Sequence, residues 1–123
     1  MKVNIFNRSK RIIINKRTLS QIIQQTIKKE KCTFDQVNII ITTDRYMRKL
    51  NNRYLKKDRA TNVIAFNLGA VGEIYVSAEL ARDRYDLHFF IIHGTLHICG
   101  YNDGSVLDRK LIDSKTLKLL ENV

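Results

Sequence analysis

Hydrophobic and polar positions along the chain predict four strands and about five helices. Alternating or β-branched segments predict strands at 2–6, 36–43, 62–66 and 73–76, with the last two forming a hairpin around a glycine-containing turn. Residues 11–14 are apolar but fit neither a strand nor a helix clearly. Helical spacing predicts a helix over about 16–30, with a possible capping box at Thr18 and Gln21, and a short one over 44–52 with Asp44 as N-cap.

The second half of the sequence is predicted to be mostly helical. A short helix is expected from Ser77, and a last helix over about 105–121 with Ser105 as its cap. That last helix is expected to turn inward Leu107, Leu111, Ile112 and Leu119. Residues 87–99 are apolar almost all round, which predicts a buried central helix that ends at Gly100. The predicted fold is α+β, a small four-stranded sheet packed with helices in a single domain over residues 1–123.

Composition adds a strong positive charge. The 123 residues are 44% hydrophobic, enough for a core, and 22 Lys and Arg against 12 Asp and Glu give a net charge of +10. Nucleic acid is the first partner this favours and an anionic membrane surface the second, while a merely solubilising role is the alternative. Cys32 and Cys99 are far apart and indicate no disulfide scaffold, so a reducing cytoplasm is expected. No signal peptide is recognised, and the run 87–99 is too short to span a bilayer.

The segment HGTLHICGYND at 93–103 carries the chemistry. His93 and His97 are four residues apart, so on a helix they point the same way and can share one metal ion. Gly100 can release the chain from the helix, and Asp103 then lies where a third ligand is needed. Three ligands leave one position for water, as in a catalytic zinc site rather than a closed structural one.

Other interpretations of this segment are weaker. Two core histidines without a ligand would be costly to bury. The zinc-protease pattern H-E-x-x-H requires a general-base Glu where this chain has Gly94. His88 is expected on another side of the helix, exposed or structural, and Cys99 is interpreted as a core residue rather than a ligand. Asn102 is the rival of Asp103, but a carboxylate neutralises a dication better.

Three blocks resemble the YbeY family of bacterial endoribonucleases for ribosomal RNA maturation. HGTLHICGYND is similar to the family signature H-G-x-L-H-L-x-G-Y-D-H. The segment LNNRYLKKDRATNVIAF at 50–66 is similar to the family's L-N-x-x-Y-R-x-K-D-x-x-T-D/N-V-L-S-F. The segment GEIYVS at 72–77 is similar to its G-D-I-x-I-S. The resemblance implies a cytoplasmic, zinc-dependent endoribonuclease that cuts single-stranded RNA of the small ribosomal subunit, in rRNA maturation and ribosome quality control. Ribosomal proteins are possible partners, and no membrane is implied.

The resemblance places one Zn2+ on His93, His97 and Asp103, which are expected to act in catalysis through a metal-activated water. The family usually has His where this chain has Asp103, a change toward harder metals such as Mn2+ or Mg2+. An Arg that the family uses near the substrate phosphate is replaced by Leu55. Nearby cations are expected to bind substrate in its place, or else to form only a solvated loop: Arg53, Lys56, Lys57 and Arg59. Alternatives are a ribosome-associated RNA-binding factor with weak or lost catalysis, and a metal-dependent hydrolase of another substrate.

Overall fold

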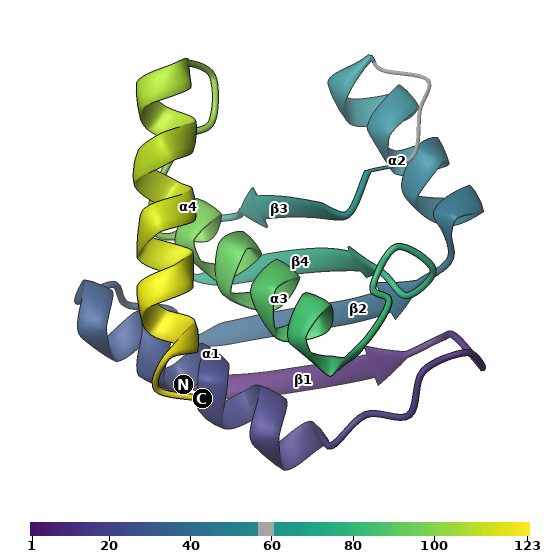
Figure 1. Cartoon of the computed structure of the whole chain (residues 1–123), viewed down its shortest axis with the longest axis horizontal. Helices are drawn as coiled ribbons and strands as arrows, with labels where there is room; N and C mark the ends of the chain where they lie inside the picture. Colours follow the sequence, from purple (N-terminus) through teal and green to yellow (C-terminus); the bar gives the residue numbers. More distant parts are fainter. Residues whose placement is uncertain (57–60) are drawn as a thin grey trace.

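The computed structural model describes residues 1–56 and 61–123, which form one mixed sheet and four helices (Figure 1). The strands are β1 (Lys2–Asn7), β2 (Gln36–Thr42), β3 (Val63–Asn67) and β4 (Val71–Ser77). The helices are α1 (Lys16–Glu30), α2 (Asp44–Leu55), α3 (Arg84–Ile98) and α4 (Val106–Leu120). The strand order is β1-β2-β4-β3, with β3 antiparallel to β4 and the other neighbours parallel. The predicted α+β class with a four-stranded sheet is confirmed.

The inner face of the sheet forms the main core. Because side chains alternate along a strand, β2 turns Val37, Ile39 and Ile41 to this face, where all three are fully buried. Register places Ile74 and Val76 of β4 beside them. Helices α1 and α3 pack together over this face, and α4 packs against α3 (Figure 1). Helix α3 is therefore enclosed by the sheet and by two other helices.

Helix α2 packs against the opposite, outer face of the sheet. Its buried residues Met47 and Leu50 form a small separate cluster with Ile64 of β3. Ile64 alternates with Val63 and Ala65, which face the main core. Thr43 rather than Asp44 is the N-cap, and its hydroxyl accepts a hydrogen bond from the Tyr46 amide. The sheet is thus covered on both faces near β3, with α2 on the outer face.

Two helical predictions are wrong. No helix follows Ser77: residues 78–80 form a turn, and the next helix begins at Arg84 with Asp83 as N-cap. One helix fewer than the expected five or so is therefore found in the part of the chain that the structure describes. In α4, Leu107 and Leu111 are 78% and 53% exposed, while Ile112 is buried as expected. Helix α4 contacts α3 along a narrow stripe of its surface, so the inward contacts expected of Leu107 and Leu111 do not form.

The two cysteines lie side by side, contrary to the expectation from sequence. Cys32 follows the end of α1, Cys99 is the C-cap of α3, and the structure joins them in a disulfide. Their sequence separation of 67 positions gave no indication of this proximity. It arises because α1 and α3 lie against each other over the same face of the sheet and end close together.

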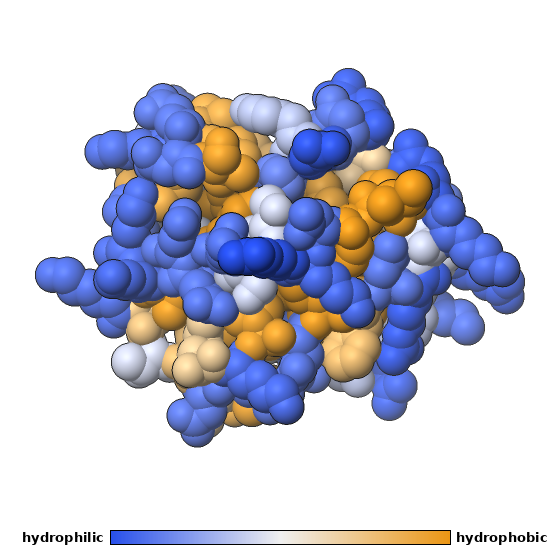
Figure 2. Space-filling model, turned by 90° about the horizontal axis from the view of Figure 1, so that it is seen from below, coloured by the Kyte–Doolittle hydropathy of each residue, from blue (hydrophilic) through white to orange (hydrophobic). Residues whose placement is uncertain are grey.

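The surface is mainly hydrophilic, with smaller apolar areas between the polar and charged side chains on the face shown in Figure 2. None of the helices in the described ranges is long and apolar enough to cross a membrane. This agrees with the expectation that the run 87–99 belongs to the core.

Candidate metal centre

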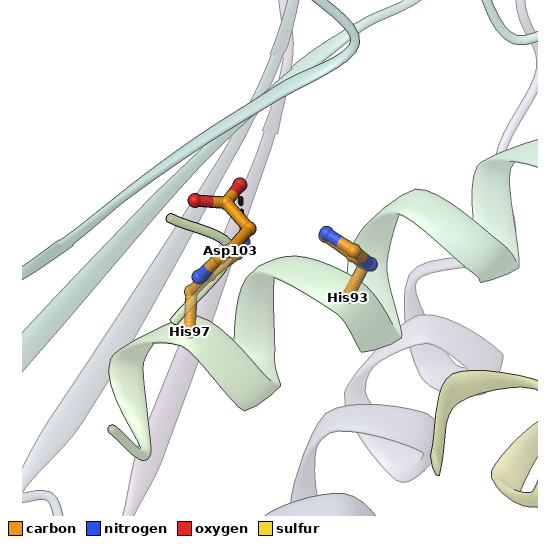
Figure 3. A group of neighbouring side chains, drawn as sticks. All are labelled: His93, His97 and Asp103. Atoms are coloured by element: carbon orange, nitrogen blue, oxygen red, sulfur yellow. Dashed lines mark ion pairs between the residues drawn. The ribbon is translucent and has the colours of Figure 1, made fainter. Parts of the chain in front are cut away.

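Gly94 sets how closely α3 approaches the sheet. A Cβ atom at this position would lie 2.6 Å from Ile74 Cγ2 and 2.9 Å from Val63 Cγ2. Glycine therefore lets the helix backbone rest directly on β3 and β4. His93, immediately before it, and His97, one turn after His93, lie about 100° and about 60° around the helix from Gly94, and both point to the same side of the helix (Figure 3). The glycine in the motif is thus a packing requirement, where a zinc protease would have its general base.

A glycine turn brings Asp103 back to the helix. Gly100 has a φ of 107°, a left-handed conformation that other residues adopt only with strain. The amides of Gly100 and Tyr101 donate to the carbonyls of His97 and Leu96 and close the end of α3. The chain then reverses, and Asp103 Oδ2 lies 3.5 Å from His97 Nε2 (Figure 3).

Three possible ligand atoms converge at this point. One ligand atom each from His93, His97 and Asp103 lies within 4.8 Å of the others. The two imidazole rings are 4.9 Å apart, centroid to centroid, at an angle of 72°. Both histidine side chains are partly buried, whereas the Asp103 side chain is 60% exposed. The predicted cluster is therefore formed, with two ligands on the helix and one on the surface.

The hydrogen bonds of His97 leave the right nitrogen free. Its Nδ1 lies 2.9 Å from the carbonyl oxygen of Tyr101, which can only accept a hydrogen bond. Nδ1 therefore carries the proton in the neutral ring, and the unprotonated Nε2 faces Asp103. A backbone carbonyl that fixes the tautomer of a histidine in this way is a regular feature of metal sites.

His93 is held in a drier environment. Phe89 stacks on its ring at 5.9 Å, and Asp113 of α4 approaches its Nδ1 to 3.7 Å, too far for a hydrogen bond. Within residues 1–56 and 61–123, Nδ1 of His93 is a buried atom without a hydrogen-bond partner. Burial first, and the neighbouring His97 second, lower the pKa of His93, against the opposing pull of Asp113 and Asp103. The ring is therefore neutral near pH 7, the form that binds metals.

The donor set fits a divalent cation. Two neutral imidazoles and a carboxylate are ligands that zinc accepts, and tetrahedral sites have ligand distances of about 2.0–2.2 Å. The ligand atoms here are slightly farther apart than such a site requires, and the exposed Asp103 has room to move closer. Two carboxylates near the same place, Asp103 and Asp113, would repel a phosphate unless a cation offset their charge.

The other predicted binding residues lie elsewhere. Arg53 is in the last turn of α2 with its guanidinium over the Tyr54 ring, and Lys56 is the left-handed C-cap of the same helix. Neither belongs to the ligand cluster. Lys57 and Arg59 lie outside the described residues. Leu55, which replaces the family's arginine, is 49% exposed.

His88, Asn102 and Glu73 take no part in the cluster. His88 is buried, with 8% exposure, so the exposed reading of this residue is wrong and the structural one applies. Asn102 is exposed, and Asp103 rather than Asn102 reaches His97. Glu73 is on the outer face of the sheet, where it accepts a hydrogen bond from the Tyr75 hydroxyl.

Two residues near the ligands were not expected from the sequence. Asp113 faces His93 from α4, and the Arg109 guanidinium donates to the backbone carbonyl of Asp103 at 3.2 Å. Both belong to α4, whose position relative to α3 depends on the chain reversal after Gly100. Arg109 is sixteen positions after His93 and Asp113 is twenty positions after it. These spacings follow no pattern within one helix, so the proximity of the two residues to the site is visible only in the folded structure.

Comparison with known proteins agrees with this arrangement. The family model described as "Endoribonuclease YbeY" matches residues 4–123. The chain belongs to this family. Curated members include endoribonuclease YbeY of Geobacter sulfurreducens, 34% identical over 83% of this chain and 81% of its own length. The protein of the same name from Amoebophilus asiaticus is 32% identical over 82% of this chain and 78% of its own length.

The family assignment extends to the three-dimensional structure. A solution structure of a protein from Thermotoga maritima matches with a TM-score of 0.63 and 27% sequence identity. The match covers 97% of this chain and 87% of the other. The predicted membership of the YbeY family, made on three sequence blocks, is therefore confirmed along almost the whole chain.

Proposed function

We propose that this chain is a metal-dependent endoribonuclease that cuts single-stranded RNA and acts in maturation of small-subunit rRNA and ribosome quality control. Residues 1–123 act as one domain in the cytoplasm, and one Zn2+ is held by His93, His97 and Asp103. The observation that carries the proposal is the convergence of these three ligands in a member of an endoribonuclease family. The net charge of +10 suits an RNA substrate.

The residues of the site would divide the work as follows. A zinc ion held by His93, His97 and Asp103 would supply Lewis acidity, which activates water and polarises a phosphate oxygen. The Tyr101 carbonyl fixes the orientation of His97, and Asp113, 3.7 Å from His93 Nδ1, would orient His93 by moving to hydrogen-bond distance. Arg109, beside Asp103, is placed to attract a phosphate that approaches the exposed side of the cluster. Arg53, Lys56, Lys57 and Arg59 bind the RNA backbone in this proposal.

The proposal is tested by metal analysis and by one substitution. The purified chain should bind one equivalent of zinc or a related transition metal. His97→Ala should abolish cleavage of a single-stranded RNA while its affinity for that RNA stays close to that of the parent. Tyr85→Leu, an exposed change near the start of the same helix, is the matched control. Failure to bind any transition metal, or unchanged cleavage by His97→Ala, would reject the catalytic role.

A second function is favoured by Leu55. Loss of the arginine at this position and the change of the third ligand to Asp103 are both expected to weaken catalysis. The chain would then be a ribosome-associated RNA-binding factor with little cleavage activity. Small-subunit RNA binding with a steep salt dependence, together with no metal-dependent cleavage, would select this alternative. Cleavage of a peptide but not of RNA would instead indicate a hydrolase of another substrate. This alternative is disfavoured because the chain has Gly94 where zinc proteases have their general-base Glu.

A further inference from the structure

The outer face of the sheet carries a connected group of aromatic rings beside α2. Tyr54 and Phe66 meet edge to face at 5.4 Å, Phe66 and Tyr75 at 6.0 Å, and Tyr46 and Tyr75 at 6.2 Å. Two of the rings come from α2 and two from the neighbouring strands β3 and β4. We refer to these four residues as the aromatic surface.

Only part of the aromatic surface is needed for packing. Its inner side covers the small cluster of Met47, Leu50 and Ile64. Its outer side is open: Tyr46 is 39% exposed and Tyr54 is 52% exposed, and Phe66 and Tyr75 are half-buried. Leucine or isoleucine would cover the same small cluster without exposing aromatic rings, so packing alone does not account for two exposed and two half-buried aromatic residues at this place.

The helix that supplies two of these rings is rich in basic residues. The sequence of α2 contains four basic residues and one acidic residue, and Lys56 caps its end. The Arg53 guanidinium lies over the Tyr54 ring, 5.3 Å from its centre. The Glu73 carboxylate accepts a hydrogen bond from the Tyr75 hydroxyl. Exposed rings interleaved with Arg and Lys are typical of surfaces that bind single-stranded nucleic acid, because bases stack on the rings and phosphates meet the cations.

The aromatic surface and the metal centre are separated by a single edge strand. On the inner side of β3, Val63 supports α3 at Gly94. On its outer side, Phe66 belongs to the aromatic surface. Asn67, the next residue, donates a side-chain hydrogen bond to the carbonyl of Ile98, which follows His97 in α3. An RNA strand that crosses the outer edge of β3 can therefore contact both the aromatic surface and the metal centre.

We propose that the aromatic surface of Tyr46, Tyr54, Phe66 and Tyr75 binds the bases of a single-stranded RNA segment by stacking, on the opposite side of β3 from the metal centre. The ligand is the RNA substrate named under the proposed function, on which this inference rests for its choice of nucleic acid. Bases stack on the exposed rings, Tyr54 first, and the basic residues of α2 meet the phosphates. Recognition is tolerant of sequence, because every base offers a flat face.

The proposal is tested by binding, separately from cleavage. The protein carries His97→Ala in every sample, and an unstructured twelve-nucleotide RNA is titrated by fluorescence anisotropy at several salt concentrations. Tyr54→Leu should weaken binding by about tenfold, the size typical of losing one stacked base, with an unchanged salt slope. Tyr54→Phe should restore most of the affinity because it keeps the ring. Tyr85→Leu, which removes a tyrosine of 56% exposure from α3, should bind like the parent.

A strand of the same length and charge without bases distinguishes stacking from other effects. Tyr54→Leu should bind this abasic strand as the parent does. Equal affinity of parent and Tyr54→Leu for the normal RNA would overturn the proposal, as would an equal loss for both strands or an equal loss in Tyr85→Leu. If Tyr54→Leu keeps its affinity for the normal RNA but no longer binds a protein partner that the parent binds, the aromatic surface is a protein-binding site instead.

A second measurement applies even when a variant does not fold. RNA containing 5-iodouridine is irradiated with the His97→Ala protein, and crosslinked residues are identified by mass spectrometry. Crosslinks at Tyr46, Tyr54 or Phe66 support the proposal, and crosslinks confined to other parts of the chain contradict it. Neither experiment measures cleavage. Base stacking can therefore be detected even if the protein is not a nuclease, and a protein that is a nuclease can still be shown not to stack bases on this surface.

Discussion

His93 Nδ1 and Asp113 Oδ1 lie 3.7 Å apart, facing each other across the contact between α3 and α4. Among the residues that the structure describes, this buried nitrogen has no hydrogen-bond partner, and the carboxylate is 55% exposed and has room to approach. A shift of less than 1 Å would make this contact a hydrogen bond of normal length, about 2.8 Å for a charged acceptor. Asp113 then holds the proton on Nδ1 and directs Nε2 of His93 toward a metal ion.

This relationship makes Asp113 a positioning residue for metal binding. Asp113→Ala should weaken zinc affinity by about tenfold, the lower end of the effect of losing a partner to a metal-bound histidine. Asp113→Asn should lose less, because its amide oxygen still accepts from Nδ1. Affinity is measured by competition with a chelating dye, and Glu121→Ala, at the end of α4, controls for charge. Equal affinities for Asp113→Ala and Glu121→Ala would remove Asp113 from the site.

The third ligand is expected to set metal preference. Asp103→His replaces a carboxylate oxygen with a nitrogen ligand, which favours zinc over manganese. Competition between the two metals should therefore shift toward zinc in the variant, and the parent should hold manganese relatively better. Asn122→His, at an exposed position beyond the end of α4, is the control. An unchanged zinc-to-manganese ratio in Asp103→His would show that Asp103 does not bind the ion.

Gly94 is expected to tolerate no side chain. The Cβ of Gly94→Ala would meet methyl groups of Ile74 and Val63 at 2.6 and 2.9 Å. These β-branched side chains on strands have little rotamer freedom, so α3 must move. We expect a loss of about 1–3 kcal/mol in the free energy of unfolding, more than the gain of about 1 kcal/mol from the better helix former. Gly104→Ala, with no atom within 4 Å, should be nearly neutral in the same urea titration.

The disulfide is expected to contribute strongly to stability. Chain-entropy arguments give about 4 kcal/mol for a bridge that closes a loop of 67 residues. The oxidised protein should therefore unfold at higher denaturant concentration than the reduced protein or the Cys32→Ser variant. Thiol titration of the denatured protein reports whether the bridge is present. Identical unfolding midpoints for fully oxidised and fully reduced samples would contradict this expectation.

Stability should fall at mildly acidic pH because of His88. Burial first, and Arg84 second, lower its pKa below the ordinary value of 6.5. As the pH falls below 6.5, the unfolded chain binds a proton that the folded chain does not, so the free energy of unfolding decreases until the folded pKa is reached. His88→Leu should reduce this loss between pH 7 and pH 5 in chelator-treated protein. A pH dependence as steep as that of the parent would exclude His88 as the cause.

The ligands on α3 could be predicted because their signal is local. His93 and His97 share one face of a helix by spacing alone, and Gly100 marks the reversal that brings Asp103 back. Asp113 and the Cys32–Cys99 pair depend on how α1, α3 and α4 pack, and no spacing in the sequence encodes that. Leu107 and Leu111 illustrate the opposite error. Their apolar spacing predicted buried contacts, but both side chains are exposed because neither the sheet nor α3 extends beneath them.

The burial of α3 has a consequence for how an ion would come and go. Two ligands stand on the most enclosed helix, whose exposure requires opening of the main core, while Asp103 lies on an exposed return segment. Local opening of such a segment costs far less free energy than unfolding of a core helix. Ion exchange would therefore proceed by release of the carboxylate, with the histidines held in place, and its rate would report the motion of residues 100–105 rather than the global stability of the protein.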